Sequence, residues 1–148
     1  AGLTEIPCIV MSTDDKESGM AAVIENLQRQ DLDFIEEAQG ISNLMSLFGM
    51  SQEQTARMLG KSQSAVANKL RLLRHSQPVL EQLRNQGLTE RHARALLKLR
   101  NEDETLAAIS EIARQGMSVA RTEKYIEGLL LQKKEKTDFN EVLIWNIL

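Results

Sequence analysis

The chain has 148 residues, enough for one or two small domains whose core needs no disulfide or metal to hold it. Hydrophobic residues make up 42% of the sequence and charged residues 26%, and the few aromatic residues favour helices packed through Leu, Ile, Met and Ala. We find no run of eighteen apolar residues and no signal-peptide pattern, so the sequence argues against a membrane or exported protein and we expect a cytoplasmic one.

The first predicted element is a short buried β-strand in residues 3–11, where apolar and β-branched residues crowd together. The only cysteine, Cys8, lies in this run and is interpreted as a buried thiol, not as a nucleophile or metal ligand. A helix is predicted from Asp14 to about Gln28. A second is predicted to start near Asp33, with apolar residues every three or four positions, and to stop at Gly49 (Phe34, Ala38, Ile41, Met45 and Phe48).

A helix-turn-helix is predicted around Gly60. Ser51 followed by Gln54 is a capping-box pattern that opens a helix ending near Leu59, and Ser62 is a new helix-start signal. Gly60 suits the turn, which requires a strained backbone in other residues. Leu59 at the end of the first helix would face inward, as would Val66 and Leu70 on the second. The outward face of the second helix would consist of Gln63, Ser64, Ala67, Asn68 and Arg71.

Four further helices are predicted along the rest of the chain. Their ranges are 78–85 ended by Gly87, 89–99, 102–114 ended by Gly116, and 118–131. The charged run "QKKEK" at 132–136 is interpreted as a linker, and "TDFNEVLIWNIL" at 137–148 as a possible first strand of a further domain.

The charge of −3 is unevenly distributed. Residues 57–100 contain ten basic and two acidic residues, a net charge of +8, whereas the remainder carries −11. A compact basic segment indicates local polyanion binding, and the alternative is a solvated basic face. The outward residues of the second helix are types that contact base edges and phosphates, and Ser62 with the helix N-terminus could hold a phosphate. A plain helical bundle for protein contacts is the rival interpretation.

Two histidines, His75 and His92, lack partners at the spacing of metal ligands or a catalytic triad. We therefore expect each to lie at the surface or to contact the backbone, which leaves an enzyme without support in the residues themselves.

Three motifs in order make the chain resemble the ParB superfamily of chromosome-partition proteins, and within it the nucleoid occlusion, or Noc, branch. They are "ENLQRQDLDFIEEA" at 25–38, "MLGKSQSAVANKLRLL" at 58–73 and "LTERHARALLKL" at 88–99. The Noc-like positions are Gln63, Lys69, Arg74 and the Glu90–Arg91 pair before His92. The resemblance implies a mainly α fold: a helix-turn-helix DNA-binding domain with a helical subdomain, plus a remnant strand and helix of an α+β ParB-type N-terminal domain.

The resemblance divides the chain into residues 1–30, from the N-terminal nucleotide-binding domain, 31–131, the DNA-binding domain, and 132–148, a linker and possible start of a C-terminal dimerisation domain. It implies a homodimer on a short palindromic DNA site, of the Noc type or, as the alternative, of the ParB type. An ordinary helix-turn-helix regulator is a further alternative, although it has no use for the "ENLQR" helix. The predicted DNA-binding residues are Lys61, Ser62, Gln63, Ser64, Asn68, Lys69, Arg71, Arg74, Arg91 and His92.

The resemblance also implies CTP and magnesium as cofactors, a sliding clamp on DNA and slow CTP hydrolysis. The matching nucleotide-binding positions are Glu25, Asn26, Gln28 and Arg29, with Asn26 near the magnesium. From the residues alone, an ion pair between Glu25 and Arg29 on a solvated helix face is the favoured explanation.

Phosphate-binding motifs that precede this region in relatives do not occur here, so we expect an N-terminally truncated chain that binds DNA but not CTP and has no catalytic residues of its own. Relatives of the Noc branch also contact membranes through an N-terminal amphipathic helix, which we expect to lie upstream. The expected location is the nucleoid.

Overall fold

The computed structural model describes residues 13–147, and every regular element among them is a helix. The strand predicted in residues 3–11, with Cys8, lies outside the described residues. The chain forms two compact units, Ala1–Ala67 and Asn68–Leu148, which divide within one helix. This division differs from the three predicted domains, whose boundaries at 30 and 131 stay predictions.

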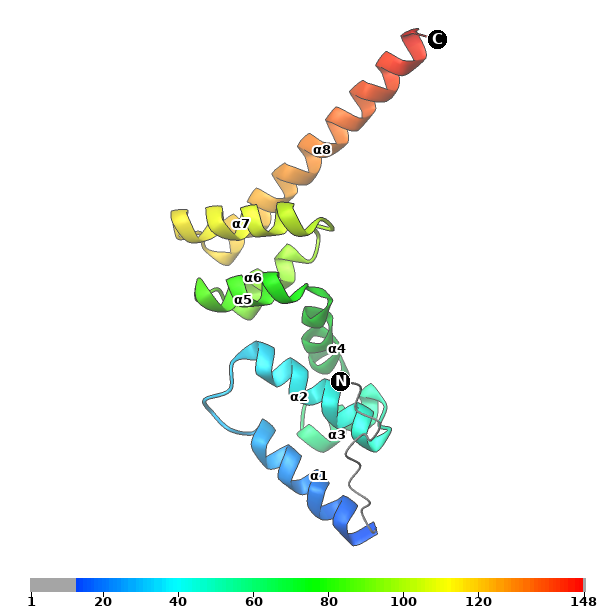
Figure 1. Cartoon of the computed structure of the whole chain (residues 1–148), viewed down its shortest axis with the longest axis vertical. Helices are drawn as coiled ribbons and strands as arrows, with labels where there is room; N and C mark the ends of the chain where they lie inside the picture. Colours follow the sequence, from blue (N-terminus) through cyan, green and yellow to red (C-terminus); the bar gives the residue numbers. More distant parts are fainter. Residues whose placement is uncertain (1–12, 148) are drawn as a thin grey trace, which may run out of the picture. The chain divides into compact units, whose positions relative to one another are not determined.

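The first unit contains α1 (Thr13–Leu27), α2 (Phe34–Phe48), α3 (Gln52–Leu59) and the start of α4 (Gln63–Arg71). Helix α1 packs against α2, and α2 against α3 (Figure 1). The contact between α1 and α2 is close at Gly40, where a Cβ atom would collide with the side chain of Leu27. Gly40 therefore lets the two helices approach.

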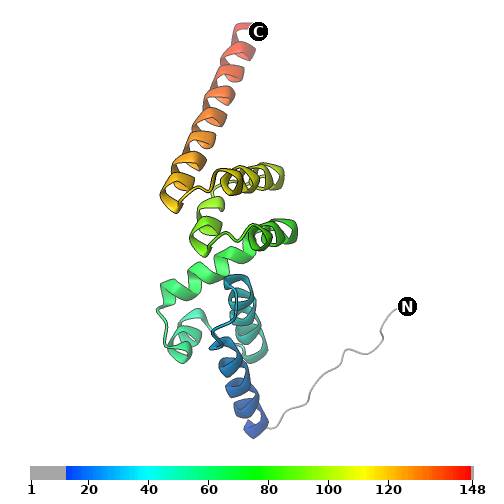
Figure 2. The same ribbon diagram turned by 90° about the vertical axis from the view of Figure 1, so that its left-hand side faces the viewer.

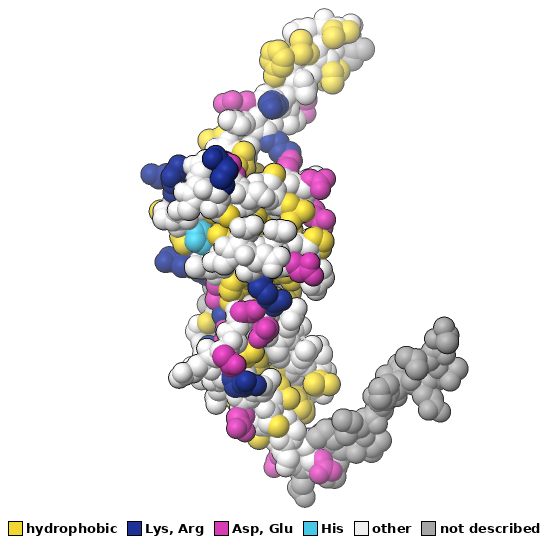
Figure 3. All heavy atoms as spheres, turned by 60° about the vertical axis from the view of Figure 1, so that its left-hand side comes forward, with side chains coloured by type: hydrophobic (Ala, Val, Ile, Leu, Met, Phe, Trp, Pro, Cys, Tyr) yellow, Lys and Arg dark blue, Asp and Glu magenta, His cyan; other side chains and the backbone are white. Residues whose placement is uncertain are grey.

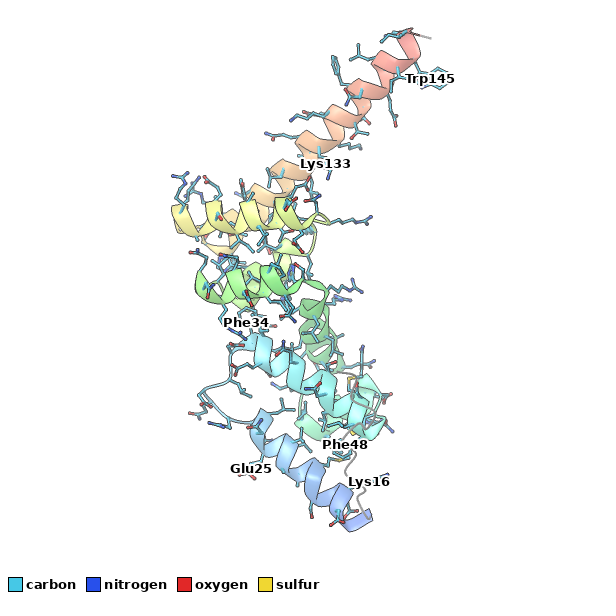
Figure 4. All side chains as sticks on the ribbon, in the orientation of Figure 1. Lys16, Glu25, Phe34, Phe48, Lys133 and Trp145 are labelled. Carbon is cyan, nitrogen blue, oxygen red and sulfur yellow. The ribbon has the colours of Figure 1, made fainter. Side chains whose placement is uncertain are left out.

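Helix α2 confirms the predicted start and stop. The carboxylate of Asp33 accepts a hydrogen bond from the Glu36 amide at 2.7 Å, and Gly49 ends the helix with a left-handed φ of 61°. Its buried face agrees only in part with the prediction. Ala38 and Ile41 are buried as predicted, but the other buried residues are Ile35 and Leu44, one position away from the predicted Phe34 and Met45. Phe34 and Phe48, at the two ends of α2 in Figure 4, are only half-buried.

The predicted helix-turn-helix is present. At the start of α3, Ser51 and Gln54 form the reciprocal capping box, with Oγ 3.1 Å from the Gln54 amide and Oε1 2.9 Å from the Ser51 amide. Gly60 has φ 64° and ψ 30°, and the next amide, of Lys61, donates to the Ala56 carbonyl at 2.9 Å. Val66 is fully buried. The turn thus lets α4 begin at Gln63, with only residues 60–62 between the two helices.

The second unit contains the end of α4, a 3-10 turn (Leu72–Arg74), α5 (Gln77–Asn85), α6 (Glu90–Leu96), α7 (Glu102–Gln115) and α8 (Val119–Ile147). Helix α5 packs against α7, and α6 against the first part of α8 (Figure 1). Large aliphatic side chains from all these elements form its core, namely Leu72, Leu83, Leu96, Ile109, Ile112 and Ile126. Helix α6 ends at Leu96, before the predicted Leu99, because the amides of residues 97–99 bond to carbonyls three positions back.

The prediction of a linker and strand in residues 132–147 is wrong, since α8 continues as a helix through Ile147 (Figure 2). Lys, Glu and Gln, which dominate residues 132–136, are good helix formers, so their charge does not break the helix. Lys133 also donates to Glu104 of α7 at 2.9 Å (Figure 4). The last turns carry exposed apolar side chains, and Trp145 is 79% exposed.

Gly60→Ala should destabilise the protein by about 1–2 kcal/mol, because a side chain strains a backbone with positive φ. The cost is conformational only, since no atom lies within 4 Å of the added Cβ. Gly128 in α8 has equally open surroundings without positive φ, so Gly128→Ala should instead stabilise by up to about 1 kcal/mol through helix propensity. Urea unfolding of both variants measures the difference, and shifts of the same sign would contradict it.

Candidate nucleic-acid interface

The start of α4 places four predicted DNA-binding residues on the surface of the first unit. The hydroxyl of Ser62 accepts a hydrogen bond from the Ala65 amide at 3.1 Å and so caps the helix. Lys61 lies beside Glu37 at 3.3 Å, and the side chains of Gln63 and Ser64 are exposed. The exposed amide of Gln63 sits in the first turn of α4, which is where recognition helices contact base edges.

The end of α4 and the turn after it place three more predicted residues in the second unit. Arg71 and Arg74 are exposed, and Asn68 is half-buried. The Asn68 Oδ1 atom accepts a hydrogen bond from Arg71 Nη1 at 3.3 Å. The two guanidinium groups are therefore available to phosphate, and Asn68 helps to orient one of them.

Lys69 occupies a different environment from these arginines. Its side chain is only 14% exposed, and Nζ lies 2.7 Å from Oε2 of Glu90, whose side chain is 29% exposed. Glu90 is the first residue of α6, directly before the exposed Arg91. The structure thus pairs Lys69 with Glu90, which belongs to the Noc-like Glu90–Arg91 pair but is not among the predicted DNA-binding residues.

Glu90 was missed because a carboxylate does not favour DNA binding by itself. A signal was present, since Glu90 is one of only two acids among the twelve charged residues of the basic segment. An acid retained there is expected to have a local partner.

His92 is 8% exposed, and both of its ring nitrogens are used inside the second unit. Nδ1 accepts from the Thr89 backbone amide at 3.3 Å, which leaves the proton on Nε2, where it is donated to the Met117 carbonyl at 3.1 Å. His92 therefore ties the start of α6 to the segment before α8. The expected backbone contact is confirmed, while its predicted DNA contact stays a prediction.

His75 also contacts the backbone. Its Nε2 atom donates to the Ala93 carbonyl at 2.8 Å, which joins the end of the 3-10 turn to α6. Burial lowers the pKa of His75, and the hydrogen bond to Ala93 opposes that shift only in part. The neutral form is thus the one that the folded protein favours.

The predicted nucleotide-binding residues lie at the end of α1. Glu25 and Asn26 are exposed on the helix, whereas Gln28 and Arg29 follow its last residue, Leu27, in a turn. Arg29 pairs with Asp31 at 3.1 Å, not with Glu25 as the alternative interpretation had it. Among residues 13–147, no group of three or more His, Cys, Asp or Glu side chains is arranged to hold a metal ion.

Charge is sorted within the second unit. Figure 3 shows several Lys and Arg side chains along one flank of α5 to α7 and Asp and Glu side chains along the opposite flank. No helix in the described range 13–147 is long and apolar enough to cross a membrane. The turn at Gly60 between α3 and α4 and the exposed start of α4 define a helix-turn-helix protein.

Comparison with known proteins identifies the family. The model of the ParB HTH domain matches residues 30–131, and the chain belongs to this family. Nucleoid occlusion proteins are similar to it: that of Geobacillus thermodenitrificans is 45% identical over 129 residues, with 87% of this chain and 46% of the relative covered. That of Oceanobacillus iheyensis is 43% identical over 135 residues, with 91% and 47% covered. The chain thus spans about half the length of the curated relatives that it matches.

Two solved structures are also similar. The C-terminally truncated chromosome-partitioning protein ParB from Caulobacter crescentus, complexed to the centromeric parS site, has a TM-score of 0.68 and 37% identity, with 86% of this chain and 66% of that chain covered. A ParB DNA-binding domain complexed to the parS site has a TM-score of 0.62 and 37% identity, with 73% and 75% covered.

Stability should fall as the pH drops through the range just below the ordinary histidine pKa of about 6.5. Because the folded pKa of His75 is lowered, the unfolded chain binds a proton that the folded chain resists, so stability is complete above the unfolded pKa and declines through the folded one. Urea midpoints between pH 7.5 and 5 measure this. His75→Gln should flatten that part of the curve, and an unchanged slope would contradict the assignment to His75.

Proposed function

We propose that this chain is the DNA-binding part of a nucleoid occlusion type of protein, which binds a short palindromic DNA site sequence-specifically as a homodimer and locates to the nucleoid. The observation that carries the proposal is the turn at Gly60, which presents Gln63 and Ser64 at the exposed start of α4, inside the +8 segment. Neither a solvated basic face nor a bundle for protein contacts needs a recognition helix placed there.

The relatives support the same function. The curated ones are named nucleoid occlusion proteins, and the two solved structures are ParB proteins bound to parS, a centromeric DNA site. A ParB-type partition protein on a parS-type site is the alternative. Three side chains bear on the choice of bases, namely Gln63, Lys69 and Arg91, whereas Arg74 is expected to hold phosphate. Gln pairs with adenine, and Lys and Arg with guanine, so replacing these residues changes the preferred bases.

The palindromic symmetry of the proposed DNA site favours a homodimer. A palindrome repeats one half-site in two orientations, so two copies of one recognition helix, related by two-fold symmetry, can bind both halves. Affinity then comes largely from phosphate contacts, for which the exposed Arg71 and Arg74 are suited, and choice of site comes from base contacts.

Of the CTP-dependent clamp, this proposal includes only a contribution of α1 to the nucleotide site. Asn26 offers an amide oxygen of a kind that magnesium binds, and Arg29 a guanidinium of a kind that phosphate binds, but both lie on a solvated surface at the end of α1. Two exposed side chains do not by themselves enclose a CTP–magnesium site. In a complete nucleotide site, Asn26 and Arg29 would line one side of the pocket.

The experiment that tests the function is competition between three DNA duplexes in electrophoretic or anisotropy binding assays. They are a Noc-type palindrome, a parS-type palindrome and a random duplex, each at about 0.2 M salt, where non-specific phosphate binding is weakened. The Noc-type palindrome should bind most tightly. Preference for parS would favour the partition protein, and equal binding of all three would contradict sequence-specific recognition.

Gln63→Ala should weaken the preferred palindrome by about 1–3 kcal/mol, roughly 5- to 150-fold in Kd, and leave random DNA nearly unchanged, since it removes a base contact. Arg74→Gln is the matched comparison: removing a phosphate contact should weaken all duplexes alike and lower the salt slope by about one. Anisotropy titrations at several salt concentrations measure both effects. A uniform loss for Gln63→Ala would place it on the phosphate backbone instead.

CTP should not bind this 148-residue chain with micromolar affinity in the presence of Mg²⁺, because Arg29, the one guanidinium among the four predicted nucleotide-binding residues, is exposed and paired with Asp31. Isothermal titration with CTP and Mg²⁺ measures the affinity, and Asn26→Ala serves as the control variant. Saturable micromolar binding that Asn26→Ala abolishes would overturn this expectation.

A further inference from the structure

The ion pair between Lys69 and Glu90 places an acid against a cation that the site is expected to use. The two side chains are 21 positions apart in sequence, and their charged atoms meet at 2.7 Å with both side chains mostly covered. An ion pair at this distance is a charge-assisted hydrogen bond, stronger than a fully exposed pair. The contact therefore orients the ammonium group of Lys69.

Glu90 is itself held in place. It is the first residue of α6, where the helix N-terminus stabilises a carboxylate, and the preceding residue, Thr89, caps the helix through its side chain. The hydrogen bond from His75 to the Ala93 carbonyl joins the same helix to the turn that follows α4. Two contacts thus connect the end of α4 to α6, and the exposed Arg91 follows Glu90 directly.

We propose that Glu90 is a positioning residue for the choice of DNA site, acting through Lys69. This inference rests on the proposed function. Glu90 directs the ammonium group and offsets its charge, so that Lys69 contributes to base selection more than to general attraction of phosphate. A carboxylate in a basic segment then improves discrimination between sequences at the expense of total affinity.

The physical reason is the flexibility of lysine. Its ammonium group is a point charge on a four-carbon stem, and without a partner it can reach whichever phosphate is nearest. Such a contact is equally favourable on every sequence and adds to the salt dependence. Glu90→Gln keeps the size and a hydrogen-bonding oxygen but removes the charge, so it should weaken the hold on Lys69 and shift it toward this indiscriminate role.

The test compares the full 148-residue wild type with Glu90→Gln, Lys69→Met and the double variant on the preferred palindrome and on random DNA. Glu90→Gln should bind random DNA several-fold more tightly, steepen its salt slope by about one, and lower the palindrome-to-random ratio by about fivefold or more. In the Lys69→Met background, Glu90→Gln should leave that ratio unchanged, because the residue through which Glu90 acts is gone.

Glu104→Gln is the matched control. Glu104 lies in the same unit and pairs with Lys133 at 2.9 Å, so its replacement changes the net charge equally, away from α4 and α6. It should leave the palindrome-to-random ratio at the wild-type value. Glu90→Asp, which retains the carboxylate, should preserve most of the discrimination, and circular dichroism checks that each variant folds.

Two results would overturn the inference while leaving the proposed function intact. One is a palindrome-to-random ratio in Glu90→Gln that equals that of the wild type, when the wild type itself discriminates between the two DNAs. The other is an equal fall of the ratio with and without Lys69, which would show that Glu90 acts only on the fold. If the wild type does not discriminate between the palindrome and random DNA, the proposed function fails and the inference fails with it.

Discussion

The left-handed backbone at Gly60 is the constraint on which the candidate interface depends. It ends α3, lets the Lys61 amide bond back to the Ala56 carbonyl, and allows α4 to begin at Gln63, three residues later. A residue with a side chain would strain this turn, and a longer connection would move the first turn of α4. The turn also fixes where Gln63 lies, as the exposed first residue of α4.

In the second unit, polar contacts of α6 hold the helices and turns in place. Lys69, His75 and His92 each join α6 to another segment, through Glu90, Ala93 and Met117. All three contacts are partly or wholly shielded from water, where hydrogen bonds orient side chains firmly and a missing partner is costly. The basic segment is therefore more than a set of surface charges: some of its polar side chains hold the framework and others stay exposed for a partner.

Most helix boundaries could be predicted because they depend on neighbours within a few residues. Asp33, Ser51 and Thr89 cap helices by bonds to amides three positions on, and Gly49, Gly60 and Gly116 end them with positive φ. Errors arose where local signals are ambiguous. Residues 132–147 combine good helix formers with a β-branched apolar cluster, and only the continuous helix α8 resolves which preference prevails.

In the candidate interface, too, some features could be predicted from the sequence and others could not. Residue types and spacing were enough to place Gln63 and Ser64 at the exposed start of a recognition helix, since helix periodicity determines which side faces outward. Burial of His92 and pairing of Lys69 with Glu90 were decided by the tertiary structure alone. The partners lie about twenty or more positions apart in sequence, and no local pattern encodes such a contact, because it exists only once helices distant in sequence have packed together.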